Sequence, residues 1–260
     1  MSKAFDITFL GTCACDFSPR LKGELRDCFD KDARRSSAVL INKRFLIDCG
    51  THTLDSLRIA GADTDLITDI FITHLHSDHF NADNIAAIAR GHKSPLRLWV
   101  RADAMLDDIE NVQRIRMESF KKYSVTEGLE LTAIPANHAP SAYPQHFILE
   151  SCGKKMFYGC DGGWFLNESF IYLKRASLDL AVLDCTVGDY VGDFRMGEHN
   201  SIPMIRLMLP SLLNVGAIRE DTEIYLSHLA PSLHEPHEIT VRIAEDFGAK
   251  VAYDGLTIEI

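Results

Sequence analysis

Three histidines and an aspartate occupy six consecutive positions of this 260-residue chain, as His74, His76, Asp78 and His79. They follow the apolar run 70–72, which is typical of a buried strand, so they lie where the strand ends and the chain turns toward a helix. His74 and His76 share a face if the strand geometry continues, whereas Asp78 and His79 lie past the turn. The segment therefore predicts ligands for two metal ions, and imidazole with carboxylate leaves zinc, iron and manganese open.

Polar side chains also follow other predicted strands, so the first segment is one case of a repeated pattern. The strand ends carry Asp48, His74, His138, Asp161, Asp184 and His228. One edge of a layered sheet would carry all of them, and we expect them to converge there. Asp48 has two compatible interpretations, because it can accept hydrogen bonds from turn amides or orient a metal-binding histidine from behind.

His199 and Asn200 stand directly before an apolar helix expected at about 202–213. Asn200 is a good N-cap, and the N-terminus of a helix attracts anions. A phosphate bound beside His199 would therefore be well placed. The alternative is that His199 is a solvent-exposed residue ahead of a capped helix.

The remaining periodicity predicts a chain of strands with a few helices. Strands are expected at 1–10, 37–41, 45–50, 96–100, 130–134, 147–150, 155–158, 178–185, 223–227, 251–253 and 256–260. Helices are expected at 84–89, 102–118, 167–175 and 236–247. His234 and His237 are expected on the surface, at the start of the last helix.

Seven cysteines, an odd number, indicate a reducing compartment where most of them serve as small core residues. Cys13, Cys15 and Cys28 lie close together near the N-terminus and could form a structural zinc site with a fourth ligand. Their spacing lacks paired C-x-x-C knuckles, so free thiols in a functional loop are the other interpretation.

The composition indicates one soluble globular domain covering residues 1–260, since 46% of the residues are hydrophobic, 25% are charged and no linker divides the chain. A formal charge of −10 makes a long nucleic acid an unlikely partner. The N-terminus alternates like a strand and does not resemble a signal peptide, and no run is long enough to span a membrane. We therefore expect a cytoplasmic protein with no membrane partner.

The motif H-x-H-x-D-H at positions 74–79, followed by a distant His, an Asp and a final His, resembles the metallo-β-lactamase-fold hydrolases. The resemblance spans nearly the whole chain. It implies an α/β protein with a four-layer αββα sandwich, in which two mixed sheets lie inside and the helices outside. It also implies a metal-dependent hydrolase.

The resemblance further implies a set of metal ligands. One metal would be held by His74, His76 and His138, and the other by Asp78, His79 and His228, with Asp161 bridging. Some members of the family use a cysteine near the bridging position, so Cys160 is an alternative to Asp161. Both ions are expected to be zinc, with manganese or iron as alternatives.

Within the family, the chain is most similar to the phosphoribosyl cyclic phosphodiesterases and the transfer-RNA 3′-processing endonucleases. The residues that carry this likeness are Gly11-Thr12, 34–37, His199-Asn200 and 252–255. It implies a phosphodiesterase acting on a small, linear or cyclic phosphodiester through a hydroxide held between the metals. Asp78 would orient that nucleophile, and His199 would bind phosphate or protonate the leaving group.

Related enzymes suggest a structural zinc near the last ligand. The position three residues past His228 is Pro231, so that zinc would need His234 or His237. Two other functions remain open for the main site: hydrolysis of a thioester, lactone or β-lactam, and metal binding without turnover. A dioxygen-using iron enzyme and a homodimeric assembly are further alternatives.

Overall fold

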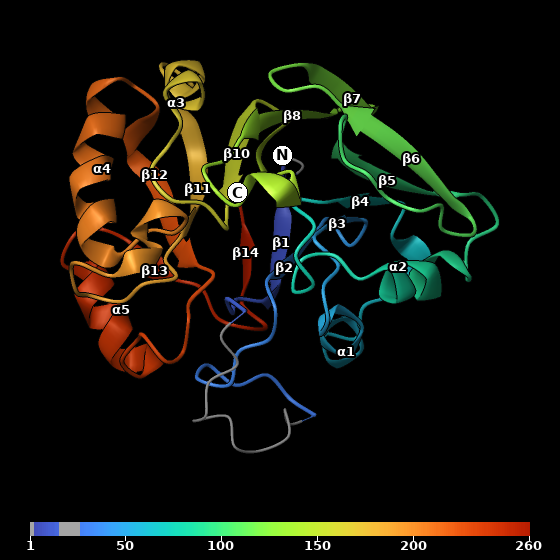
Figure 1. The fold of residues 1–260 in the computed structure, drawn as a ribbon, viewed down its shortest axis with the longest axis horizontal. Coiled ribbons are helices and arrows are strands. Elements are labelled where there is room, and N and C mark those ends of the chain that lie inside the picture. Colours follow the sequence, from blue (N-terminus) through green and yellow to red (C-terminus); the bar gives the residue numbers. More distant parts are fainter. Residues whose placement is uncertain (1–2, 16–26) are drawn as a thin grey trace.

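Two seven-stranded sheets face each other, and helices cover the outer face of each (Figure 1). This computed structural model describes residues 3–15 and 27–260. The arrangement is the four-layer αββα sandwich that the sequence predicts, and both sheets are mixed.

The first sheet has the order β14 (Thr257–Glu259), β1 (Asp6–Gly11), β2 (Ala38–Ile41), β3 (Phe45–Ile47), β4 (Asp69–Phe71), β5 (Leu96–Arg101) and β6 (Val112–Met117). Strands β14 to β3 pair antiparallel, and β3 to β6 pair parallel. The β2–β3 hairpin turns at Asn42 and Lys43, which both have positive φ as a tight hairpin turn requires. The predicted hairpin is confirmed.

The second sheet has the order β13 (Lys250–Val251), β12 (Ile218–Ser227), β11 (Leu178–Asp184), β10 (Lys154–Gly159), β9 (Gln145–Ser151), β8 (Leu129–Pro135) and β7 (Lys122–Thr126). Strands β10 to β13 pair parallel, and β7 to β10 pair antiparallel. The carboxyl ends of β10, β11 and β12 therefore meet at one edge of this sheet.

In the described residues, five α-helices form the outer layers. Helices α1 (Thr53–Ile59) and α2 (Ala82–Ala89) cover the first sheet, and α3 (Asn167–Leu173), α4 (Ile202–Asn214) and α5 (His237–Glu245) cover the second (Figure 1). Short 3₁₀ turns lie at η2 (Thr64–Leu66), η3 (Pro140–Ala142) and η4 (Phe194–Gly197). Among the described residues, no helix is both long and apolar enough to cross a membrane.

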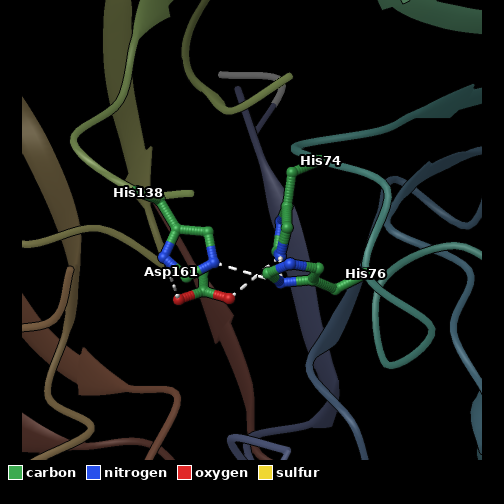
Figure 2. Close-up of side chains that lie close together, drawn as sticks. All are labelled: His74, His76, His138 and Asp161. Carbon is green, nitrogen blue, oxygen red and sulfur yellow. Dashed lines mark hydrogen bonds and ion pairs between the residues drawn. The ribbon is translucent and has the colours of Figure 1, made fainter. Parts of the chain in front are cut away.

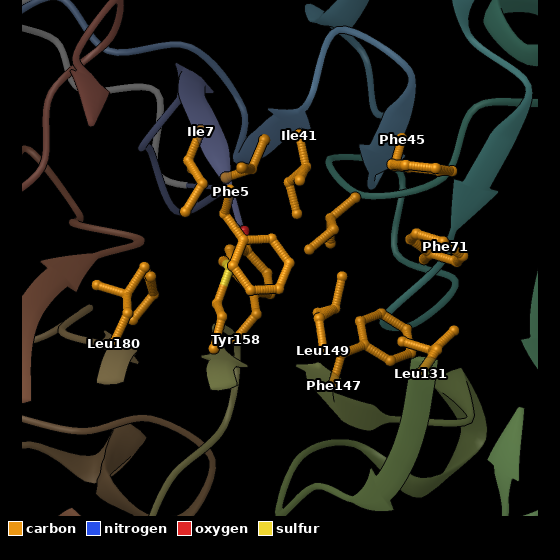
Figure 3. Close-up of a cluster of buried hydrophobic side chains, with 14 of the residues drawn as sticks. Phe5, Ile7, Ile41, Phe45, Phe71, Leu131, Phe147, Leu149, Tyr158 and Leu180 are labelled. Atoms are coloured by element: carbon orange, nitrogen blue, oxygen red, sulfur yellow. The ribbon is translucent and has the colours of Figure 1, made fainter. Parts of the chain in front are cut away.

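Three hydrophobic clusters correspond to the three interfaces between the four layers. Strand β2 is apolar throughout because both of its faces are buried. Val39 and Ile41 point into the core between the sheets, and Ala38 and Leu40 pack toward the helices. Figure 3 shows the inter-sheet core, where side chains of β1 to β4 meet those of β8 to β11. Because both faces are buried, such a strand lacks the alternation of apolar and polar residues that half-exposed strands show.

The helix predicted at 102–118 is wrong, because residues 112–117 form strand β6. This strand pairs with β5 along its whole length, from Leu96 opposite Val112 to Arg101 opposite Met117. It is an edge strand in which Met117 alone is fully buried, so its polar residues gave it a mixed pattern that also fits a helix. Pairing with a distant neighbour decides the conformation.

The expectation that His234 and His237 lie on the surface is also wrong, because both are buried. Nε2 of His234 lies 2.7 Å from the carbonyl oxygen of Cys185, and Nδ1 of His237 lies 3.0 Å from Nη2 of the buried Arg34. Their partners come from segments about 50 and 200 residues away, which local sequence does not reveal.

Of the three cysteines near the N-terminus, Cys13 is buried, and Cys15 and Cys28 are exposed. In the described part of the chain, no cysteine belongs to a group that could hold a metal ion, and neither His234 nor His237 does. A structural zinc at these positions therefore has no support in the described residues.

Candidate metal centre

The ends of five strands deliver the candidate ligands to one place. The residues that follow β3, β4, β8, β10 and β12 include Asp48, His74, His138, Asp161 and His228, and all of them are buried. Asp48, Asp161 and His228 have φ values of 62°, 59° and 58°. Non-glycine residues rarely adopt this left-handed conformation, and its cost is typical of functional sites.

His74, His76 and His138 form the first group, together with Asp161 (Figure 2). Nδ1 of His76 lies 3.0 Å from Nε2 of His74 and 3.1 Å from Nε2 of His138. Oδ2 of Asp161 lies 3.0 Å from Nε2 of His74. Four ligand atoms from three separate segments thus point at one another.

Asp78, His79 and His228 form the second group, again with Asp161. Nε2 of His79 lies 3.1 Å from Nε2 of His228 and 3.3 Å from Oδ2 of Asp78. Oδ2 of Asp161 lies 3.5 Å and 3.6 Å from the Nε2 atoms of His79 and His228. A single carboxylate oxygen therefore borders both groups.

The donor sets fit metal ions. Tetrahedral zinc with nitrogen ligands at 2.0–2.1 Å places neighbouring nitrogens about 3.3 Å apart, close to the spacings within each group. Oδ1 of Asp78 is buried and has no hydrogen-bond partner among the described residues, although an unpaired carboxylate oxygen is costly inside a protein. A metal ion, or a water molecule held on it, would satisfy this atom.

The ionisation of the site reflects the balance between burial and neighbouring charge. Burial lowers the pKa of His74 and of His138 to about 4. Burial also opposes the charged form of His228, but Asp161, Asp184 and Asp78 raise its pKa to about 9. Burial would raise the pKa of Asp161, yet His228 and His74 hold it well below its usual range. The buried carboxylates of the site thus require positive charge beside them. Divalent cations supply such charge in metal centres.

Two threonine hydroxyls hold the outer nitrogens of histidines in the two groups. Thr73 Oγ1 donates to Asp48 Oδ2 at 2.8 Å and lies 3.1 Å from Nδ1 of His74. Asp48 also accepts from the Thr73 amide at 2.8 Å and lies 2.7 Å from Nδ1 of His79. Asp48 therefore plays both of its predicted parts, since it binds a turn amide and fixes a histidine.

Thr186 repeats this arrangement on the other sheet. Its hydroxyl donates to Asp184 Oδ2 at 2.8 Å and lies 2.8 Å from Nδ1 of His228. A protonated Nδ1 on each of His74, His79 and His228 leaves Nε2 as the atom with a lone pair. The Nε2 atoms are the ones that converge in the two groups.

The comparisons with known proteins agree with this geometry. A family model described as a β-lactamase superfamily domain matches residues 43–253. The chain belongs to this family. The match covers the first histidine cluster and every other residue of the two groups.

Similar proteins from this superfamily carry phosphodiesterase names. A segment of 80 residues is 39% identical to the human protein named zinc phosphodiesterase ELAC protein 1, covering 30% of this chain and 18% of that protein. The chain thus matches less than a fifth of the length of that relative.

Two solved structures show the same fold over almost their whole length. A diphosphatase from the PhnP family has a TM-score of 0.74 at 18% identity, covering 98% of this chain and 97% of that one. The short form of human tRNase Z has a TM-score of 0.65 at 20% identity, covering 97% and 98%.

His199 lies beside the two groups of this superfamily site. Its Nδ1 is 2.9 Å from Oδ1 of Asp161 and 3.4 Å from Oδ2 of Asp184. Burial opposes its charged form, but hydrogen bonds to these two carboxylates raise its pKa to about 10. The exposed alternative for His199 is therefore wrong.

Asn200 does not cap helix α4, so that prediction is wrong as well. Ser201 is the N-cap, and its hydroxyl accepts a hydrogen bond from the Met204 amide. Asn200 instead donates its backbone N–H to Asp184 Oδ1 at 2.8 Å and its side-chain amide to the Gly162 carbonyl at 3.0 Å. It links the loops that carry Asp161 and His199.

A cleft of about 590 Å³ opens onto the centre. Its lining includes Ala14, Cys15, His76, Ser77, Asp78, His138, Asp161, Thr186, Arg195, Glu198, His199, His228 and Ala230. Cys160, the alternative to Asp161, is instead buried in the core between the sheets. The structure thus turns Asp161 to the cleft and Cys160 away from it.

Sequence reasoning missed four residues of this superfamily site: Thr73, Thr186, Arg195 and Glu198. Thr73 directly precedes the first histidine, and Thr186 follows Asp184 by two positions. A threonine next to a strand-end ligand is a usable signal, although threonine is common in strands. Arg195 lies in the short 3₁₀ turn η4 and Glu198 follows it, and no periodic pattern in the sequence marks either residue.

Proposed function

We propose that this protein is a dinuclear metal-dependent phosphodiesterase that hydrolyses a small phosphodiester, linear or cyclic. The observation that supports it best is the position of Asp161 Oδ2, which borders His74 on one side and His79 and His228 on the other. One oxygen shared by two sets of donors is what a bridging ligand requires. In this proposal His74, His76 and His138 hold one ion, Asp78, His79 and His228 hold the other, and Asp161 bridges.

Two bound divalent ions would supply an activated water and neutralise charge on the phosphoryl group. Asp78 lines the cleft, and its buried Oδ1 would accept a hydrogen bond from the attacking water and so orient it. His199 also lines the cleft, and Asp161 and Asp184 engage its Nδ1. Nε2 is then the ring nitrogen that would protonate the leaving alkoxide.

Zinc is the ion that we propose, because imidazole and carboxylate donors suit it and a similar curated protein is named a zinc phosphodiesterase. Manganese and iron fit the same donor types. The formal charge of −10 favours a small substrate over a long nucleic acid, whose phosphates bind mainly to lysine and arginine.

The test combines metal analysis with a substrate panel. Protein purified without chelator should carry about two ions per chain and should hydrolyse bis(4-nitrophenyl) phosphate or a cyclic nucleotide in preference to a thioester or a cephalosporin. Light scattering on the same preparation reports whether it is a monomer or a homodimer. Preference for the thioester or the cephalosporin would show a carbonyl hydrolase, and bound metal without any turnover would show a binding module.

Asp161→Asn is the variant that tests the bridging role. The amide keeps the shape of the side chain but removes its charge, so both ions should be held more weakly and turnover should be lost. Asp69→Asn is a matched control, because Asp69 is equally buried but lies at the start of β4, bound to Trp99 Nε1 and Arg97. Loss of only one ion in the Asp161 variant would contradict bridging.

A further inference from the structure

Three exposed apolar residues belong to segments next to residues that line the cleft. Phe194 in η4 is 87% exposed, and Met196 and Trp164 are 48% and 46% exposed. We call these three residues the rim. Large apolar side chains in a group on the surface are unusual enough to indicate a binding site.

Phe194 is tied directly to the wall of the cleft. Arg195, which lines the cleft, holds its guanidinium over the Phe194 ring with Cζ 5.0 Å from the ring centroid. Nε and Nη2 of Arg195 bind Asp193 Oδ1 and Oδ2, each at 2.8 Å, which fixes the arginine side chain. The carbonyl oxygen of Arg195 accepts a hydrogen bond from the His199 amide at 2.9 Å, so η4 is bonded to the segment that carries His199.

Trp164 belongs to a different segment, which packs against the loop that carries Met196 and His199. It follows Asp161 by three positions, and its carbonyl oxygen accepts a hydrogen bond from Asn137 at 3.0 Å. The Gly163 amide donates to Asn137 at 2.9 Å, and a Cβ on Gly163 would lie 3.3 Å from the Met196 carbonyl oxygen. The rim is thus built on the segments that carry Asp161, His138 and His199.

We propose that the rim binds a flat aromatic ring on the non-leaving arm of the substrate. This inference rests on the proposed phosphodiesterase function. An exposed aromatic ring offers a face on which another ring can stack, and such stacking tolerates many ring types.

Continuity with the cleft favours a substrate over a protein partner. Arg195 and Glu198 face the cleft from the same turn that presents Phe194 and Met196. A protein that covered this turn permanently would also cover the entrance to the metal centre. An occupant that leaves with each turnover is compatible with access to the site.

The test compares two diesters that release the same group. Thymidine 5′-(4-nitrophenyl phosphate) and methyl 4-nitrophenyl phosphate both release 4-nitrophenolate, so the chemical step is alike and the non-leaving arm differs. The metal-loaded wild type should favour the nucleoside diester in kcat/KM. Phe194→Ala should raise KM for that diester about 10-fold and change the methyl diester less than about 2-fold.

Two further variants separate stacking from general apolar contact. Phe194→Tyr keeps a flat ring and should retain the preference, and Leu207→Ala removes an exposed side chain of α4 and should have no effect. Equal activity of the wild type on the two diesters, or an equal loss for both in Phe194→Ala, would overturn the inference. A change of oligomeric state in that variant without a change of preference would also overturn it and make the rim an interface.

A binding measurement separates this inference from the proposed function. Thymidine 5′-monophosphate and methyl phosphate are titrated into the metal-loaded protein by calorimetry. If neither diester is hydrolysed, the phosphodiesterase proposal fails, but weaker binding of thymidine monophosphate to Phe194→Ala would still support the rim site. Equal binding to the variant and the wild type would overturn it.

Discussion

Oδ2 of Asp48 lies 2.7 Å from Nδ1 of His79, and the opposite nitrogen of the same ring lies 3.1 Å from Nε2 of His228. The carboxylate holds the proton on the outer nitrogen and so directs the lone pair of the inner one to the centre. Asp48 is fully buried, and its other oxygen accepts from the Thr73 amide. Both oxygens of this carboxylate are therefore used as acceptors.

Asp48→Asn should weaken metal binding at the second group. An amide has one acceptor oxygen, so either His79 or the Thr73 amide loses its partner, while the left-handed backbone at position 48 tolerates asparagine. Loss of such an outer contact typically lowers metal affinity or activity 10- to 100-fold. Metal content after dialysis should fall from two ions toward one.

Asp69→Asn controls for the loss of a buried carboxylate, since Asp69 also uses both oxygens, toward Trp99 and Arg97. This control should lose stability and keep its metal. If Asp48→Asn retains both ions as firmly as the wild type does, Asp48 does not support the second group.

Thr186→Val should disturb His228 and His199 together. The hydroxyl lies 2.8 Å from Nδ1 of His228 and 3.1 Å from Nδ1 of His199, and valine keeps its shape without the oxygen. We expect a 10- to 100-fold loss of metal affinity or of kcat/KM, and recovery in Thr186→Ser.

Thr222→Val is the matched control for that variant. Thr222 Oγ1 donates to the Leu178 carbonyl at 2.6 Å, away from the metal centre. Each valine variant leaves buried polar groups without a partner, which costs roughly 1–3 kcal/mol of stability. Equal kinetic defects in the two valine variants would show that lost stability, and not the position of the histidines, explains the effect.

His199→Ala should lower the rate while the metal content stays the same. Loss of an acid catalyst typically costs 10²- to 10⁴-fold. The loss should be smaller for a 4-nitrophenyl diester than for an alkyl diester, because 4-nitrophenolate leaves without a proton. A full rate would refute the proposed role, and loss of metal would instead make His199 a ligand, since its Nδ1 lies near Asp161 and Asp184.

The sequence predicts most of the fold because several inner strands, such as β2 and β11, are buried on both faces. Segments such as 38–41 and 178–184 are therefore short apolar runs bounded by turns, and the structure confirms them as β2 and β11. Edge strand β6 lacks this signal. Its conformation depends on pairing with β5, which a local pattern does not contain.

The sequence predicts those residues of the candidate site that directly follow strands. The cluster at 74–79 is local, and His138 and His228 gained significance because they repeat its position after a strand. The structure brings them together. Thr73 and Thr186 act through hydrogen bonds to residues of other segments, Asp48 and His228, so their place beside a strand-end residue is only a weak signal in the sequence.

His234→Gln should reduce the loss of stability in mild acid. Burial lowers the pKa of His234 to about 4, below the value of about 6.5 in an unfolded chain. Between these values the unfolded chain binds a proton that the folded protein does not, so this group destabilises the fold as pH falls through that window. Between pH 7.5 and pH 5 this histidine should lower the free energy of unfolding by about 2 kcal/mol.

Glutamine does not titrate and still offers a donor to the Cys185 carbonyl, so urea unfolding of the metal-loaded variant should show a smaller pH dependence. His92→Gln controls for the loss of a histidine that bonds a backbone carbonyl, that of Thr64. If wild type and His234→Gln lose the same free energy of unfolding between the two pH values, His234 is not the neutral buried group that its surroundings require.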